Sequence, residues 1–462
     1  MRVGLTVLAL GSALALGSLT GCMNLQPRYE RPLPPVAPQF PLVGAENGVP
    51  AADLPWQQFF TEPRLARMIE ISLANNRDLR VAVLNIEQAR AQVGLRRADL
   101  FPTVGVGAAG NRQPAANGRS TSIYSAGFTV SSFELDLFGR VRSLTDVALA
   151  QLAATEEARK AAQIALIASV ANLHYALAGD DQFIALTRST LATREESLKL
   201  MQLRFDNGAA SDLDVQLART LVEQARVALV QQQRQRALDQ DALELLLGQP
   251  LPADMPPQAP LDAQALPDVP AGLPSDVLLR RPDVTQAEQQ LMAANASIAA
   301  ARAAFWPRIT LTGGVGVASS QLSNLFSGSI GWTFAPQLVQ PLFDAGRNRA
   351  NLRATEAARD IAVAQYERAI QSAFRDVADA LAGRATLDEQ LHAVLAQEAA
   401  ESQRFRLSEL RMRYGAASSL ELLDAQRSLF TAQQAVVQTQ LALVQNRIAV
   451  YRALGGGWTE TR

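Results

Sequence analysis

The sequence predicts an α+β membrane protein made of two repeated halves, each with two transmembrane β-strands and long coiled helices. Three observations lead to this prediction. Prolines cluster in two stretches, the segments around the second stretch repeat each other, and several short segments alternate apolar with small polar residues. The chain has 462 residues, of which 48% are hydrophobic and 19% charged, so it can bury a large core.

The first 21 residues have the features of a secretion signal. Arg2 precedes an apolar stretch, residues 3–16, and small residues follow up to Gly21. Cys22 comes next and is the only cysteine, so the chain cannot form an internal disulfide. The segment Leu19-Thr20-Gly21-Cys22 resembles a bacterial lipobox. We therefore expect Cys22 to carry acyl chains that hold the mature N-terminus at a membrane, with a chance free thiol as the alternative.

Proline positions divide the rest of the chain. Nine of the 23 prolines lie in residues 27–63 and eight in residues 250–274, whereas none follows Pro341. Proline breaks helices, so the long proline-free stretches are where long helices can form. The expected segments are a signal peptide (residues 1–21), a lipid-anchored proline-rich arm (22–63), a first half (64–249), a proline-rich linker (250–275), a second half (276–457) and a C-terminal tail (458–462).

The two halves share one plan. Residues 204–248 align without a gap on residues 411–455, and residues 78–102 align on residues 283–307. A repeat of about 205 residues is too long for a solenoid unit and indicates duplication of a whole half. Each half is expected to contain a helix of about 30 residues, two strands, a long helix and a return helix. The long helices are expected at residues 141–207 and 347–414, each about 100 Å long.

The final helix carries two apolar stripes, which indicates two helical neighbours. Leu422, Ala425 and Leu429 belong to one stripe, and Leu423 and Phe430 belong to the other. Polar residues occupy the remaining side. This pattern favours a closed ring of helices around a wet interior, and an ordinary coiled-coil rod is the alternative.

The strand segments alternate with a period of two. Ile309, Leu311 and Val315 alternate with small or polar residues, as do Tyr124 and Phe128. Lengths of about 7 to 10 residues, with aromatic residues near the ends, suit tilted transmembrane strands. Four strands cannot close a barrel, and an open sheet edge in lipid leaves backbone groups unsatisfied. Several chains are therefore expected to contribute to one barrel.

Other classes of function have little support. With 43 basic and 44 acidic residues the formal net charge is −1, so nucleic acid is not an expected partner. Gly105-Val106-Gly107-Ala108-Ala109-Gly110 fits a dinucleotide-binding pattern, but the residues that follow start no helix. His174 and His392 are the only histidines. We expect no metal site, no cofactor and no enzymatic activity.

The turns before the two return helices contain Gly208 and Gly415, each followed by small residues. We expect these glycines to form the helix-tip turns, with Ser418 or Ser419 as N-cap of the last helix. Leu420, Glu421 and Asp424 then lie in its first two turns. Leu420 and Asp424 are four residues apart and share one face. In the first half, Leu217 stands opposite Asp424.

Several features together resemble the TolC-like outer-membrane efflux family, in particular its acylated OprM-like lipoprotein branch. They are the lipobox, the duplicated halves, and the segments Phe133-Glu134-Leu135-Asp136-Leu137-Phe138-Gly139-Arg140, Pro341-Leu342-Phe343-Asp344-Ala345-Gly346-Arg347 and Leu422-Leu423-Asp424-Ala425-Gln426-Arg427-Ser428-Leu429. The resemblance implies that three chains form a twelve-stranded β-barrel in the outer membrane, continued into the periplasm by an α-helical barrel.

The resemblance also implies a function and partners. The chain would be the passive channel of a tripartite efflux pump, with a periplasmic adaptor and an inner-membrane transporter, often of the resistance-nodulation-division type. Leu420, Glu421 and Asp424 would line its periplasmic mouth, with three Asp424 carboxylates as a ring that favours cations and can hold a divalent ion. Two alternatives remain. Asp424 can simply favour its helix dipole, and the protein can be a lipid-anchored adaptor or coiled-coil scaffold without a pore.

Overall fold

The computed structural model describes residues 25–41, 51–114, 120–262, 266–267, 275–327 and 329–458. Residues 1–21, Cys22, and parts of the expected linker and tail lie outside these ranges. The chain divides into two compact units. Unit 1 comprises Met1–Leu33, Leu84–Glu156 and Gln286–Arg368, and unit 2 comprises Pro34–Val83, Glu157–Thr285 and Ala369–Arg462. Each unit therefore combines segments from both sequence halves.

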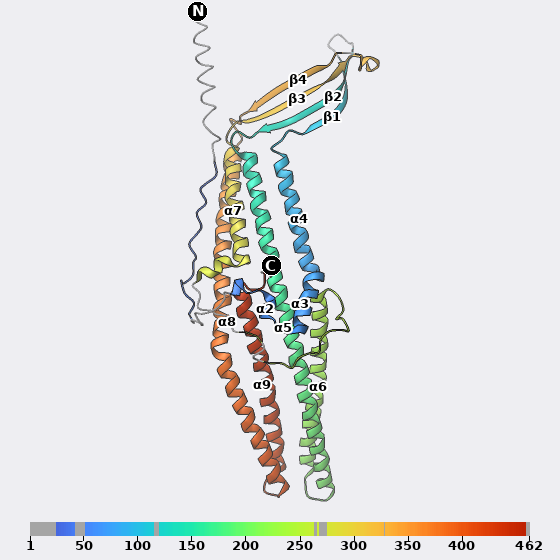
Figure 1. Ribbon diagram of the computed structural model, residues 1–462, viewed down its shortest axis with the longest axis vertical. Coiled ribbons are helices and arrows are strands. Elements are labelled where there is room, and N and C mark those ends of the chain that lie inside the picture. Colours follow the sequence, from blue (N-terminus) through green and yellow to red (C-terminus); the bar gives the residue numbers. More distant parts are fainter. Residues whose placement is uncertain are drawn as a thin grey trace, which may run out of the picture. The chain divides into compact units, whose positions relative to one another are not determined.

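Unit 1 contains one antiparallel sheet of four strands in the order β1-β2-β3-β4 (Figure 1). The strands are β1 Val104–Pro114, β2 Ser120–Leu135, β3 Arg308–Ser319 and β4 Gly331–Val339. The expected length of about 7 to 10 residues fits β4, which has nine residues, but it is exceeded by β1 with 11, by β3 with 12 and most of all by β2, which has 16 residues. This strand continues past an irregularity between Val130 and Phe133, where Ser132 has a left-handed backbone (φ 55°), and then leads into the helix that follows.

One row across the sheet consists of glycine in every strand. Gly107 pairs with Gly127, Gly127 with Gly316, and Gly316 with Gly331. A Cβ atom on Gly127 would clash with the backbone of Val315 and Gly316. The central strands β2 and β3 therefore approach too closely for a side chain at this level. Glycine within strands is typical of sites where a sheet bends or backbones approach.

The two longest helices each contribute to both units. They are α5 Arg140–Asp206 and α8 Arg347–Arg413, both of 67 residues, and their ends lie within one residue of the predicted ends. The return helices are α6 Asp212–Leu247 and α9 Ser419–Ala453. In the described part of the chain, α5 alone has an 18-residue window apolar enough to span a membrane, and 61% of that window is buried within the protein, as in a core helix.

The helix of about 30 residues expected at the start of each half is not continuous. In the first half it is divided into α3 Pro63–Asn75 and α4 Arg77–Ala98. Asn76 between them has an extended backbone, and its side chain accepts a bond from Leu79 N–H (2.9 Å) and donates one to the Leu246 carbonyl (2.9 Å). A side chain that bonds to nearby backbone competes with the helix, which explains the break. In the second half, η2 Ser275–Arg280 precedes α7 Pro282–Ala303.

A small aromatic cluster lies in unit 2. Tyr451 of α9 stacks on Phe59 (centroids 4.0 Å apart) and meets Phe60 edge-on. Its hydroxyl donates to the Leu54 carbonyl at 2.7 Å. Phe59 ends α2 Trp56–Phe59, which follows η1 Ala51–Asp53; the remaining short element is η3 Leu322–Asn324 in unit 1. The cluster ties the segment before α3 to the C-terminal helix.

Candidate functional site at the helical tips

Both hairpin turns close in the same way. Gly208, between α5 and α6, and Gly415, between α8 and α9, have left-handed backbones with φ of 71° and 73°. In each turn the N–H of the residue after the glycine bonds to a carbonyl five residues earlier, at 2.7 Å, from Ala209 to Arg204 and from Ala416 to Arg411. This is the bonding of a Schellman motif, in which glycine avoids the cost of a left-handed conformation.

The return helices start with serine caps. Ser211 caps α6 in a reciprocal capping box: its hydroxyl accepts from Asp214 N–H, and the Asp214 carboxylate accepts from Ser211 N–H. The Ser211 hydroxyl and backbone bonds lower the pKa of Asp214. Ser418, one of the two expected caps, accepts from Glu421 N–H at 3.3 Å at the start of α9. The second tip lacks the reciprocal half of the box, because the Glu421 carboxylate bonds to Arg411 at 2.9 Å.

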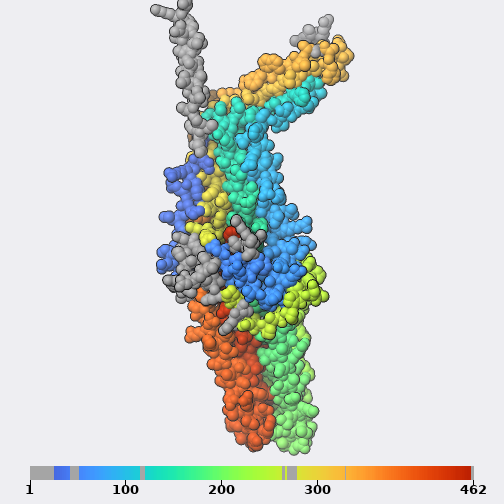
Figure 2. Space-filling view, viewed as in Figure 1, coloured from blue at the N-terminus to red at the C-terminus, as the bar shows by residue number. Residues whose placement is uncertain are grey.

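An apolar cluster joins the two hairpins in unit 2, just behind the tips. Its buried members are Met201, Val215, Ala218, Leu221, Met412, Leu422 and Leu423. Beside it, the Gln426 amide donates to the Ser197 hydroxyl at 2.7 Å, and Gln426 is only 6% exposed. Figure 2 shows the green first hairpin and the orange-red second hairpin side by side. Burial of these side chains holds α9 against α5 and α6.

Leu420 and Leu213 lie outside this cluster. Leu420 is 61% exposed, and its counterpart Leu213 in the first half is 68% exposed. Both are the second residue of their return helix. Large apolar side chains thus face away from the core at both tips.

Asp424 is paired with two arginines. Its carboxylate accepts from Arg404 of α8 and from Arg427 of α9, both at 2.5 Å. Arg404 also contacts Glu401 at 3.1 Å. The hydrogen bond from Arg404, supported by the charge of Arg427, holds the pKa of Asp424 below its usual value. The carboxylate is therefore ionised and largely compensated within its own chain.

Neither arginine was among the residues expected at the mouth. Arg427 is three residues after Asp424, a spacing that could have revealed it. Arg404 is 20 residues before Asp424 and reaches it only because α8 and α9 pack in a particular register. The expected ring of three Asp424 carboxylates remains a prediction, and any such ring would carry guanidinium groups beside the carboxylates.

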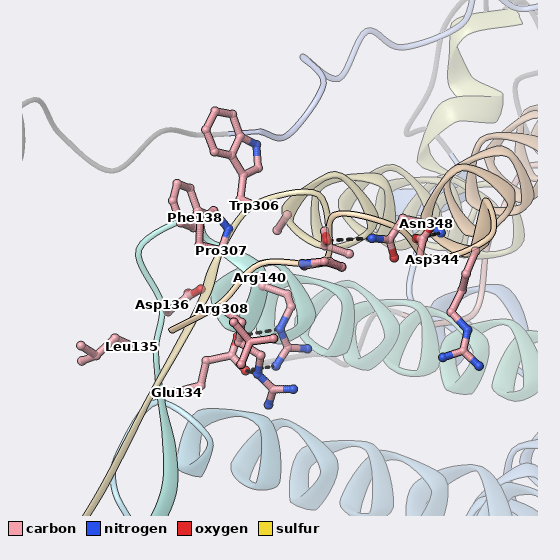
Figure 3. Close-up of a pocket in the computed structure, with 15 residues that line it drawn as sticks. Glu134, Leu135, Asp136, Phe138, Arg140, Trp306, Pro307, Arg308, Asp344 and Asn348 are labelled. Atoms are coloured by element: carbon pink, nitrogen blue, oxygen red, sulfur yellow. Dashed lines mark hydrogen bonds and ion pairs between the residues drawn. The ribbon is translucent and has the colours of Figure 1, made fainter. Parts of the chain in front are cut away.

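A second polar cluster lies in unit 1, where the strands meet the helices, around a cavity of about 390 Å³. Figure 3 shows Arg140 and Arg308 directed at Glu134. The Arg140 guanidinium makes two bonds to Glu134, both 2.7 Å, and Arg308 lies at 2.6 Å. Trp306 stacks on Phe138 with centroids 5.1 Å apart. These charges satisfy one another and join β2, β3 and α5, so the cluster is structural.

Aspartates cap both long helices at this junction. Asp136 accepts from the N–H groups of Val141 and Arg142 at the start of α5. Asp344 accepts from Gly346 and Asn348 at the start of α8. The segment around Asp136 and the related segment around Asp344 therefore do the same thing. Each caps the first turn of the long helix that follows a strand.

The glycine pattern and the two histidines noted in the sequence lie in ordinary structural positions. The six residues of the glycine pattern Gly105–Gly110 lie in β1, which pairs with β2, and do not lead into a helix. His174 is buried and bonds to Glu62 at 2.8 Å, whereas His392 is exposed on α8. Among the described residues, no group of three or more His, Cys, Asp or Glu side chains is arranged to hold a metal.

Comparison with known proteins gives a consistent result. The family profile described as "Outer membrane efflux protein" matches residues 68–249 and 273–456. The chain is 48% identical to the probable efflux pump outer membrane protein TtgC of Pseudomonas putida, over 96% of this chain and 94% of the relative. It is 45% identical to outer membrane protein OprJ of Pseudomonas aeruginosa, over 98% and 96%.

A solved structure gives the same picture. The open state of the MtrE outer membrane channel of Neisseria gonorrhoeae superposes with a TM-score of 0.86 at 39% identity, covering 94% of this chain and 99% of that one. These relatives are outer-membrane efflux proteins and channels. They support the expected channel and not the alternative of an adaptor or scaffold without a pore.

Proposed function

Since the chain belongs to the outer membrane efflux protein family, we propose that it is the passive outer-membrane channel of a tripartite efflux pump. The observation that supports this most is the sheet. Its two outer strands, β1 and β4, are edge strands. Within the described residues, neither pairs with a further strand on its outer side. Three copies, joined edge to edge, would close a twelve-stranded barrel and satisfy these edges.

One face of the sheet suits contact with lipid. A shallow depression on it is lined by apolar side chains, among them Val104, Phe128, Leu311, Val315 and Phe334. Phe128, Val315 and Phe334 are exposed in the single chain. An exposed apolar band on tilted strands is the pattern of an outer-membrane barrel. On this proposal the two halves arose by duplication, and the α-helices continue the barrel into the periplasm.

We assign the periplasmic mouth to Leu420, Glu421 and Asp424. Threefold symmetry would bring three exposed Leu420 side chains together as an apolar constriction. Three Asp424 carboxylates, each held by Arg404 and Arg427, would form a charged ring at the next turn. We propose acylation at Cys22, which lies outside the described residues, with a periplasmic adaptor at the tips and an inner-membrane transporter of the resistance-nodulation-division type as partners.

Single-channel recording in planar bilayers tests the mouth. Leu420→Ser should raise basal conductance, because it removes an apolar side chain from the constriction. Asp424→Ala should weaken cation preference, because it leaves Arg404 and Arg427 without their carboxylate. Leu213→Ser in the first hairpin is the matched control. If folded trimers of both variants match the parent in conductance and selectivity, the constriction lies elsewhere, and if the parent trimer gives no conductance steps, the channel proposal fails.

A further inference from the structure

The N-terminal arm, residues 25–33, lies along α7 in unit 1 (Figure 1). Its strongest contact is with Glu288. The Arg31 guanidinium makes two bonds to the Glu288 carboxylate, at 2.6 and 2.9 Å, and the Tyr29 hydroxyl donates to the same carboxylate at 3.0 Å. Charge-assisted, two-pronged bonds of this kind are the strong class of side-chain hydrogen bond.

Two further side chains of α7 bind the backbone of the arm. The Asn295 amide donates to the Pro27 carbonyl at 3.0 Å, and the Arg302 guanidinium donates to the Leu25 carbonyl at 3.3 Å. Proline favours the extended polyproline conformation, in which carbonyls make no internal bonds and are free to accept. The backbone carbonyls of the arm therefore accept hydrogen bonds from side chains of α7.

The three residues of α7 are evenly spaced. Glu288, Asn295 and Arg302 are seven residues apart, and seven residues turn the helix to within about 20° of two full turns, so the three lie on one stripe. From the first to the third the helix rises about 21 Å. The arm covers about 19 Å between Arg31 and Leu25 at about 3.1 Å per residue. The two lengths match, so the arm runs antiparallel to α7 in one register.

The Glu288 carboxylate is buried, so it needs the positively charged partner that the arm supplies. Glu288 is 4% exposed, although it belongs to a residue type that is seldom buried without a partner. Removing the arm's arginine would leave a buried carboxylate without its counter-charge, which is strongly unfavourable. The arm is therefore part of the packing of unit 1.

We infer that Glu288, Asn295 and Arg302 form a docking track that fixes the position of the arm and thereby of its lipid-bearing end. This inference rests on the proposed acylation of Cys22. Cys22 comes three residues before Leu25 in the sequence and lies outside the described residues. Arg302 is six residues before Arg308, where β3 begins. The track therefore holds Leu25, the first described residue of the arm, beside the end of α7 that precedes β3.

Limited trypsin digestion of the full-length protein tests the track. Arg31 is followed by Pro32, which blocks trypsin, so the arm is cut after Arg28. Cleavage there requires the arm to leave α7, and its rate follows the fraction of undocked arm. Glu288→Gln should raise the rate of cutting after Arg28 about tenfold, and Asn295→Ala should raise it less, because one neutral bond is lost. Mass spectrometry of the released N-terminal peptide measures both.

Two further variants show whether a faster cut after Arg28 results from loss of the contact between the arm and α7. Glu87→Gln, on the exposed face of α4, removes the same charge and should leave the rate unchanged. The exchange Arg31→Glu with Glu288→Arg should restore most of the protection. Unchanged rates in Glu288→Gln and Asn295→Ala, or no recovery in the exchange, would overturn the track. Labelling with radioactive palmitate is scored separately, so an unlabelled parent with a protected arm refutes the lipid anchor but not the docking.

Discussion

The tips of the two hairpins have the same backbone and different charges. Each tip has a left-handed glycine, the same pair of closing bonds and a serine cap. The Arg404–Asp424–Arg427 cluster exists only in the second, because Ser197, Leu217 and Thr220 occupy the equivalent places in the first. The two hairpins therefore share the glycine and serine residues that the turn requires, whereas their charged side chains differ.

The largest expected difference between the hairpins is their response to pH. In the first hairpin, burial raises the pKa of Asp180 to about 7, and the neighbouring Asp239 and Asp181 add to this, while Arg236 opposes it. The folded state thus holds a proton that the unfolded state releases near the usual value. This contribution to stability is complete below pH 3.8 and is lost as pH rises through about 7.

Thermal unfolding at a series of pH values checks this expectation. The melting temperature of the parent should fall between pH 5 and pH 8 relative to that of Asp180→Asn, which cannot titrate. Asp424→Asn in the second hairpin should keep the parent's pH dependence, because the pKa of Asp424 is already lowered. Parallel pH curves for the parent and Asp180→Asn would contradict the assignment.

The next largest expected effect is the loss of stability when a turn glycine is replaced. It should be the same at both tips. Nothing lies within 4 Å of a Cβ atom built on Gly208 or Gly415, so only the backbone conformation resists substitution. Gly208→Ala and Gly415→Ala should each destabilise the local tip by about 1.5 kcal/mol. Hydrogen exchange of the turn amides measures this. Asparagine tolerates the left-handed region, so Asn at either site should destabilise the tip less than Ala does. The reverse order would show that the size of the side chain, and not the backbone conformation, limits substitution.

The serine caps should separate the two tips by a smaller amount. Ser211→Ala removes a reciprocal capping box and should cost about 1 kcal/mol, whereas Ser418→Ala removes a single longer bond and should cost about 0.5 kcal/mol. Exchange rates of the first-turn amides of α6 and α9 give both values. Equal costs would mean that the Asp214 carboxylate adds nothing to the first cap.

The smallest expected effect concerns charge at the proposed mouth. Arg404→Gln removes one partner of Asp424 and should raise the cation-over-anion permeability ratio about threefold, since exposed ion pairs are weak. Arg226→Gln is the matched control, because Arg226 also bridges two helices, to Glu195 at 2.8 Å, but in the first hairpin. A similar change in both variants would remove the distinction between the tips.

Local signals in the sequence predicted much of this fold. The ends of α5 and α8, the turn glycines and the Ser418 cap depend on residues close in the chain, where proline, glycine and serine act directly on the backbone. The alternation of apolar residues likewise predicted the positions of β2 and β3. It did not predict that β2 extends to 16 residues, because that depends on its pairing with β3 beyond the irregularity.

The sequence by itself determined the duplication pattern, the positions of β2, β3 and the long helices, and the resemblance to an outer-membrane efflux family, because these follow from periodicity, composition and local motifs. The tertiary structure decided which side chains meet. The break at Asn76, the Arg404 partner of Asp424 and the docking of Arg31 on Glu288 each join residues on different elements. Such contacts depend on the register between packed helices, and a local pattern carries no information about that register.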